Sequence, residues 1–355
     1  MGFPEMSDPA ERSLSACIGC HDQCMYASAD VLASGRQELV ISRLAAAVRS
    51  GPPNAQLTDA LFMALDQGSQ QRACIILDGS QDPRDWLREA RSSAITASGH
   101  IPVPVAALRA ARANRTPTAA LNGSYDCIVV VDALTGSRDE TGTRNLVDHL
   151  AGDGARVGLV RLASAGTLEH FAGLAAEREE LIAAAQALLA PWSATPLVSD
   201  DPAVCYASRF LWGDATPPVA HVAEYLAQAD PGAAPLVEGL PSPGPVVVND
   251  VGLLAGDLGV HAAVRSLLRA AGYPVLEAPS SGRHAREDGP MFGYPDPRVA
   301  ATLARARYDE LAATGAQAII TLAPWSRHNL APVSELPLLT LTEALAAASR
   351  VERAR

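Results

Sequence analysis

Three cysteines, Cys17, Cys20 and Cys24, lie within eight residues near the start of the chain. Such a tight loop is typical of iron–sulfur ligation, because each iron of a cluster takes one thiolate and short spacings wrap the loop around the cube. A [4Fe–4S] cube needs a fourth thiolate. In two-cluster ferredoxins, the fourth cysteine of each run ligates the other cluster. The fourth ligand is therefore sought in a second run further along the chain.

Residues 64–74 have the spacing of such a second run. Its four ligand positions, and the fourth position of the first run, hold these residues in turn: Ala64, Gln67, Gln70, Cys74 and Ser28. One cluster would need Cys17, Cys20 and Cys24 together with Cys74, and all four are present. A second cluster would need positions 64, 67, 70 and 28, and none of these is a cysteine. The pattern predicts one [4Fe–4S] cluster, held by Cys17, Cys20, Cys24 and Cys74.

Two other interpretations of the cysteines stay open. A zinc ion held by Cys17, Cys20 and Cys24 with His21 is one of them, although His21 adjoins Cys20 and neighbouring residues rarely both reach one tetrahedral metal. Buried thiols without a metal are the other. The cysteines outside these runs are Cys127, in a valine-rich stretch that predicts a buried side chain, and Cys205, a free thiol or a former ligand.

The bulk composition excludes several classes of protein. The chain has 355 residues, 48% of them hydrophobic and 19% charged, with a net charge of −11. An acidic chain without clustered Lys and Arg is unsuited to nucleic acid. No apolar run of about 18 residues predicts a membrane-spanning helix, and the N-terminus has no apolar signal-peptide core. We expect a soluble, cytoplasmic protein with no integral membrane segment and no nucleic-acid partner.

The chain divides into three regions by its expected secondary structure. Residues 1–115 are mainly helical, with helices expected at 29–50, 58–66 and 82–97 and a short strand at 74–77. Residues 116–240 and 241–355 follow one α/β order twice. In the first unit we expect strands at 125–132 and 156–162 and helices at 143–150 and 167–190. In the second we expect strands at 246–250, 273–278 and 318–322 and helices at 261–271 and 297–314. A linker rich in Pro and Gly at 232–245 separates the units.

The layout resembles the iron–sulfur subunits of the glycolate oxidase, anaerobic glycerol-3-phosphate dehydrogenase and heterodisulfide reductase families. In the second repeat, cysteine motifs of those families correspond here to Asn249-Asp250, Ser280-Ser281-Gly282 and Ala323-Pro324-Trp325-Ser326. In the first repeat, the corresponding places hold Asp132, Ser164-Ala165-Gly166 and the segment from Asp201 to Cys205, so only Cys205 remains. Trp325 and His328 are expected to fill the space of the missing cysteine pair.

The resemblance implies an α+β multidomain fold. An N-terminal α-helical ferredoxin-like domain would precede two Rossmann-like α/β repeats, which are degenerate CCG domains. It also implies an electron-transfer subunit of an oxidoreductase complex, which exchanges electrons with an FAD-dependent flavoprotein. The loss of the repeat cysteines excludes the extra clusters on which some members of these families depend.

Two further functions stay open. The repeats could form a non-redox docking module in which a cluster or zinc ion is only structural, or an enzyme could use the cleft between them, at Asp132, Asp250 or His284. Asp132 and Asp250 end equivalent strands, where we favour a role in capping or turns. A basic patch at Arg283, His284 and Arg286 contrasts with the acidic chain and could grip carboxylates.

Overall fold

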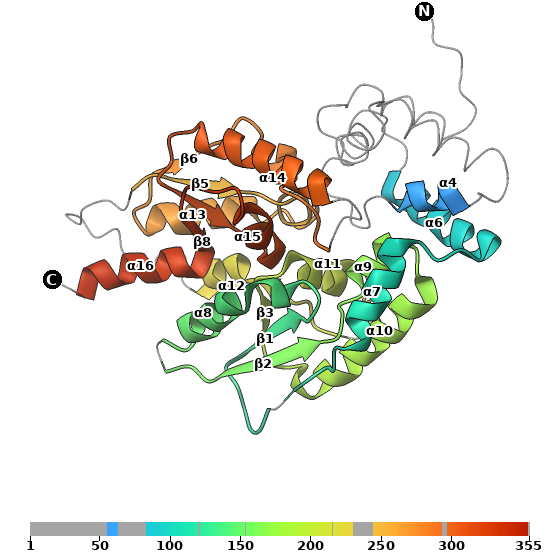
Figure 1. Ribbon diagram of the computed structural model, residues 1–355. Helices are drawn as coiled ribbons and strands as arrows, with labels where there is room; N and C mark the ends of the chain where they lie inside the picture. Colours follow the sequence, from blue (N-terminus) through green and yellow to red (C-terminus); the bar gives the residue numbers. More distant parts are fainter. Residues whose placement is uncertain are drawn as a thin grey trace, which may run out of the picture.

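In a computed structural model, the protein contains two α/β units and a set of helices that precede them (Figure 1). The structure describes residues 55–62, 83–119, 121–152, 154–214, 216–229, 244–292 and 297–353. The preceding helices are α4 (Ala55–Leu61), α6 (Pro83–Ser98) and α7 (Val103–Ala113). The expected helix at 82–97 is confirmed, whereas those at 29–50 and part of 58–66, and the strand at 74–77, lie outside the described residues.

The first unit is built on a sheet of four parallel strands. Its elements are, in order, β1 (Cys127–Asp132), η2 (Gly136–Asp139), α8 (Glu140–Leu150), β2 (Val157–Leu162), α9 (Thr167–Phe171), α10 (Ala175–Leu189), η3 (Ala190–Trp192), β3 (Leu197–Ser199), α11 (Pro202–Phe210), β4 (Ala220–His221) and α12 (Val222–Ala229). Every residue of β1 is buried, as its run of β-branched side chains predicts for a central parallel strand.

The second unit repeats this order. Its elements are β5 (Val246–Asn249), the π-helical turn η4 (Leu253–Asp257), α13 (His261–Ala270), β6 (Val275–Leu276), η5 (Gly282–His284), α14 (Pro297–Ala312), β7 (Ala318–Thr321), α15 (Pro324–Leu330), β8 (Leu338–Thr340) and α16 (Leu341–Arg353). The strand orders are β2-β1-β3-β4 and β6-β5-β7-β8, with every pair parallel. The chain is therefore an α/β protein with two similarly wound sheets, as the repeated order predicted.

One expected helix is two helices in the structure. The segment 167–190 was expected to be continuous, but it breaks between α9 and α10 at Gly173, whose φ is +73°. A Cβ at this position would lie 2.5 Å from the carbonyl oxygen of Arg88 on α6. The helix ends here because α6 packs closely against this turn, and only glycine combines that approach with a left-handed backbone.

The two units meet through equivalent elements. Helix α15 of the second unit contacts η2 of the first, and α11 of the first contacts η4 of the second; likewise α16 contacts α8, and α12 contacts α13. These reciprocal contacts relate the units by an approximate two-fold axis. Figure 1 shows the second unit, in orange and red, packed on the first, in green and yellow. The carboxyl ends of β3, β4, β7 and β8 contribute residues to the same cavity at this junction.

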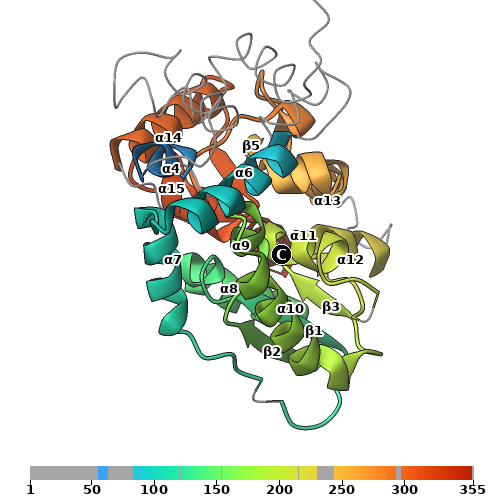
Figure 2. The same cartoon turned by 90° about the vertical axis from the view of Figure 1, so that its right-hand side faces the viewer.

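The helices before the first unit are attached to it by buried and ionic contacts. Arg91 of α6 is fully buried and donates to the carbonyl oxygens of Leu61 (2.9 Å) and Phe171 (2.6 Å). Arg109 and Arg112 of α7 both bind Glu177 of α10, at 2.5 and 2.6 Å. Figure 2 shows α6 beside α9. Within the described ranges, no helix is long and apolar enough to cross a membrane.

Candidate functional site

The four predicted cluster ligands, Cys17, Cys20, Cys24 and Cys74, lie outside the described residues. Among the residues that are described, no group of three or more His, Cys, Asp or Glu side chains is arranged to hold a metal ion.

The two cysteines of the first unit are free and buried. Cys127 is 2% exposed in β1, which confirms the prediction of a buried side chain. Cys205 is fully buried on α11, where burial and the nearby Asp201 carboxylate raise the pKa of its thiol well above the ordinary value. Cys205 is therefore a protonated thiol at neutral pH and a poor metal ligand, because the thiolate is the form that binds metals.

Asp132 and Asp250 accept equivalent hydrogen bonds from the backbone in their two units. Each follows or ends the first strand of its sheet, and each accepts a 2.7 Å hydrogen bond from a backbone N–H in the loop after the neighbouring strand. The donors are Ala165 for Asp132 and Gly282 for Asp250. Asp132 also accepts from Leu134 N–H at 2.7 Å. The expected role in turns is confirmed for both residues, and the predicted correspondence between the loops at 164–166 and 280–282 is confirmed with it.

The surroundings of the two aspartates differ in charge. Arg265 of α13 binds both oxygens of Asp250, at 3.0 and 2.7 Å, and both oxygens of Glu277, at 2.7 and 2.8 Å. Asp132 has no such cation among the described residues. Burial raises its pKa, and burial together with the Asp132 carboxylate raises the pKa of Asp201 well above the ordinary value. The carboxyl edge of the first sheet is thus an acidic interior that favours bound protons.

A buried polar network lies beside the end of β5 in the second unit. Arg307 of α14 is fully buried and donates to Asn249 Oδ1 (2.8 Å), the Ser280 carbonyl oxygen (2.8 Å) and Glu310 (3.0 Å). Asn249 in turn donates to Asp288 at 2.5 Å. Sequence reasoning missed Arg307, because an arginine inside a helix pattern is usually solvated. Trp325 is buried, as expected for a residue that fills space, whereas His328 is exposed and that part of the expectation was wrong.

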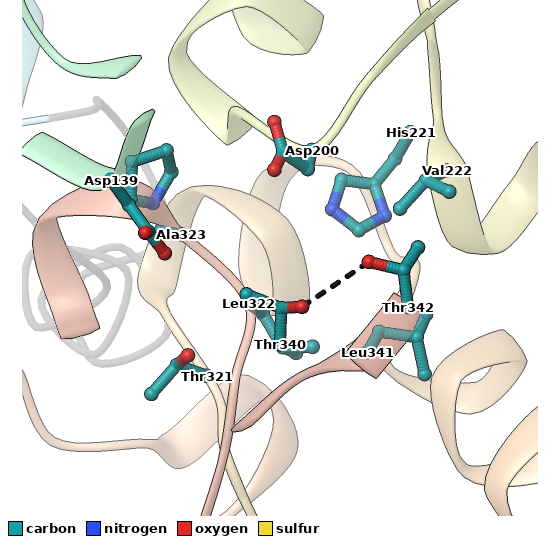
Figure 3. Close-up of a pocket in the computed structure, with 11 residues that line it drawn as sticks. Asp139, Asp200, His221, Val222, Thr321, Leu322, Ala323, Thr340, Leu341 and Thr342 are labelled. Atoms are coloured by element: carbon teal, nitrogen blue, oxygen red, sulfur yellow. Dashed lines mark hydrogen bonds between the residues drawn. The ribbon is translucent and has the colours of Figure 1, made fainter. Parts of the chain in front are cut away.

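A small cavity lies between the two units (Figure 3). Asp139, at the end of η2, lines it together with residues at or just after strand ends: Asp200, His221, Val222, Thr321, Leu322, Ala323, Pro324, Thr340, Leu341 and Thr342. Its volume of about 20 Å³ is enough for one water molecule and too small for a substrate. The cavity is therefore a polar joint between the units and not a substrate pocket.

Among the described residues that line the cavity, the acids and the imidazole come from the first unit. Asp201 and Ala323 both precede the proline that begins α11 or α15, so Asp200 corresponds to Leu322. His221 and Thr340 both precede the first residue of α12 or α16, so they correspond as well. Because β3, β4 and β8 have only two or three residues, the sequence pattern did not identify them as strands. Asp200 and His221 were missed for that reason.

Two polar atoms of this joint lack partners, and the residues that carry them have shifted pKa values. The N–H of Ala223 donates to His221 Nδ1 at 3.2 Å, which places the imidazole proton on Nε2. That Nε2 and Asp200 Oδ1 are buried and have no hydrogen-bond partner among the described residues. Burial lowers the pKa of His221 to about 4. Burial and the Asp139 carboxylate raise the pKa of Asp200 to about 6. The cavity that both residues line has room for one water molecule.

An ion pair crosses the junction beside the cavity. Arg327 of α15 lies 3.3 Å from Asp139 of the first unit and 3.0 Å from Glu343 of its own. Asn145 of α8 donates to the same Glu343 at 2.7 Å. These bonds fix the register between the units at the place where the cavity lies.

Comparison with models of known protein families found no match, and comparison with curated proteins found no relative. The fold defines the chain as a two-unit α/β protein, and its function has to be inferred from its own residues.

Proposed function

We propose that the chain is an electron-transfer subunit that carries a single [4Fe–4S] cluster on Cys17, Cys20, Cys24 and Cys74. The observation that carries the proposal is the pattern of retained cysteines: under the crossed ligation of two-cluster ferredoxins, one ligand set is complete and the other is entirely absent. Such a cluster, when bound, accepts and returns one electron at a time.

The two α/β units support this assignment in two ways. Their repeated strand order agrees with the two-repeat layout that the resemblance implies. The two units also contribute only two cysteines, Cys127 and Cys205. Cys127 is buried in strand β1 and Cys205 is buried on helix α11. Since a cube takes four thiolates, the thiolates have to come from the segment before the first unit.

The attachment of α4 and α6 supports a role for the segment between them. Residues 63–82, which include Cys74, are bracketed by these two helices, and α4 packs on α6. Arg91 binds the end of α4 and the end of α9 at once. The helices on either side of the segment are therefore held together and attached to the first unit.

The partner that we infer is an FAD-dependent oxidoreductase subunit, because a reduced flavin can release its two electrons singly to a one-electron carrier. With one cluster and no chain of further centres, both donor and acceptor would approach the same region. A cytoplasmic location is part of this proposal.

A second candidate is a docking module in which a cluster or a zinc ion only stabilises the fold of the helices before the first unit. It is favoured by the joint between the units, whose cavity is too small for a substrate. The two functions differ in one measurable property: an electron carrier has an accessible reduction potential, whereas a structural metal does not take part in electron exchange.

Substitution of Cys20 by Ser separates the candidates, with Cys205→Ser as the matched control. We expect Cys20→Ser to lose iron and sulfide while its circular dichroism stays that of a folded protein, and Cys205→Ser to keep both. We also expect the unmodified protein to be reduced by photoreduced FMN, with a potential in the range of flavin couples. Two results together would favour the structural module: Cys20→Ser unfolds, and neither FMN nor dithionite reduces the metal centre of the unmodified protein.

A further inference from the structure

The turn that follows β6 presents basic side chains in an acidic protein. Arg283 and His284, in η5, are both exposed, and Arg286 follows two residues later. None of the three forms an ion pair or a side-chain hydrogen bond with a described residue, and Nε of Arg286 is buried without a partner. We refer to residues 282–286 as the cationic turn.

Most other arginines near the sheets are neutralised. Arg109 and Arg112 bind Glu177, Arg265 binds Asp250 and Glu277, and Arg327 binds Asp139 and Glu343; these ion pairs have nitrogen–oxygen distances between 2.5 and 3.3 Å. In a chain of net charge −11, unpaired cations that share one turn create a local positive potential, which selects negatively charged partners.

The cationic turn is held in place before any partner arrives. Asp250 accepts the N–H of Gly282 at 2.7 Å and is itself gripped by Arg265. Ala285 is buried and its N–H donates to the Gly282 carbonyl oxygen at 3.2 Å. The ring of His261 lies 3.4 Å from where a Gly282 Cβ would be. Because these two hydrogen bonds and the burial of Ala285 hold the backbone of the turn, binding through it costs little ordering entropy.

We propose that the cationic turn is the surface on which this chain docks an acidic face of a partner protein. Arg283 and Arg286 would bind carboxylates through their guanidinium groups, with His284 between them. A protein face is favoured over a small anion because Arg283 and His284 are exposed at the tip of a turn, and the cavity lined by Asp200 and His221 does not include them. The inference rests on the proposed function only in taking the partner to be the redox partner.

The test uses a fluorescent octaglutamate peptide as a probe for a carboxylate-rich face. We expect the full-length protein to bind it with an affinity that falls as salt rises, and Arg283→Glu to weaken that binding about tenfold. Arg144→Glu is the matched control, since Arg144 is an exposed arginine on α8 and the change in net charge is the same. We expect the control to bind nearly as well as the unmodified protein.

Three results would overturn the proposal: no salt-dependent binding of the peptide, equal loss in Arg283→Glu and Arg144→Glu, or binding of phosphatidylglycerol vesicles or inorganic phosphate in place of the peptide. Circular dichroism of Arg283→Glu confirms that the variant is folded. Iron and sulfide are measured on the same samples. A protein that lacks a cluster but binds the peptide would refute the electron-transfer function and leave the docking surface standing.

Discussion

Replacing Asp200 by Asn should stabilise the protein at neutral and alkaline pH. Burial raises the pKa of Asp200 from 3.8 to about 6, so ionising this carboxyl in the folded protein is unfavourable by about 3 kcal/mol at 1.36 kcal/mol per pH unit. Its Oδ1 has no partner in the described part of the chain to offset that cost. Because a water in the cavity would screen part of the charge, and because Asn is itself polar, we expect a gain of about 1–2 kcal/mol.

Asp200 and His221 have opposite effects on how the stability of the protein depends on pH. A raised carboxyl pKa contributes stability that is complete below pH 3.8 and is lost as pH rises through about 6. The lowered pKa of His221, about 4 against an ordinary 6.5, acts oppositely, since the folded protein loses stability as pH falls from 6.5 to 4. The two contributions therefore partly cancel between pH 4 and 6.5. Asp200→Asn removes the contribution of the carboxyl and leaves that of His221. The free energy of unfolding of the variant should therefore fall by about 2–3 kcal/mol as pH is lowered from 6.5 to 4.

The assay is the thermal midpoint of both proteins at intervals from pH 4 to 8, followed by the fluorescence of the buried tryptophans Trp212 and Trp325. A change of 1 kcal/mol corresponds to about 2–4 °C for domains of 150–250 residues. Asp148→Asn, at an exposed position on α8, controls for the loss of one negative charge. Parallel curves for Asp200→Asn and the unmodified protein, or a lower midpoint for the variant at pH 8, would refute the contribution to stability that is assigned to the Asp200 carboxyl.

Two further predictions concern packing and ion pairing, and both are read from the midpoint of thermal unfolding. Gly173→Ala should reduce the free energy of unfolding by about 2 kcal/mol or more, because it combines a left-handed backbone with a 2.5 Å approach to the Arg88 carbonyl oxygen. The control is Gly99→Ala, where φ is +63° and the space around an added Cβ is open, and it should cost clearly less. Equal losses in the two variants would contradict the packing argument. Arg265→Met should cost about 3 kcal/mol, since it leaves Asp250 buried without its cation. Adding Asp250→Asn should recover part of that loss, and failure to recover would mean that the arginine acts by packing alone.

The sequence was most informative where one local signal dominates. The valine runs of β1 and β5 and the apolar period of α13 predicted these elements because the side chains that define them are buried in the expected way. Gly173 could not be identified as a break, since its cause is the approach of helix α6, which lies far earlier in the chain. The same limit applies to the joint: Asp200 and His221 meet only because β3 and β4 pair, and those strands are too short to leave a pattern. The turn role of Asp132 and Asp250 was predictable because aspartates that end a buried strand commonly accept hydrogen bonds from backbone N–H groups of the following turn.

Iron and sulfide analysis of anaerobically purified protein, combined with EPR after dithionite reduction, tests the electron-transfer function most directly. We predict about four irons and four sulfides per chain, as the cubane ligation requires, and a visible band that bleaches on reduction. In Cys74→Ser, we expect the iron, the sulfide and the visible band to be lost. A colourless protein without iron, or an iron content that Cys74→Ser leaves unchanged, would contradict the assignment of the cluster to Cys17, Cys20, Cys24 and Cys74.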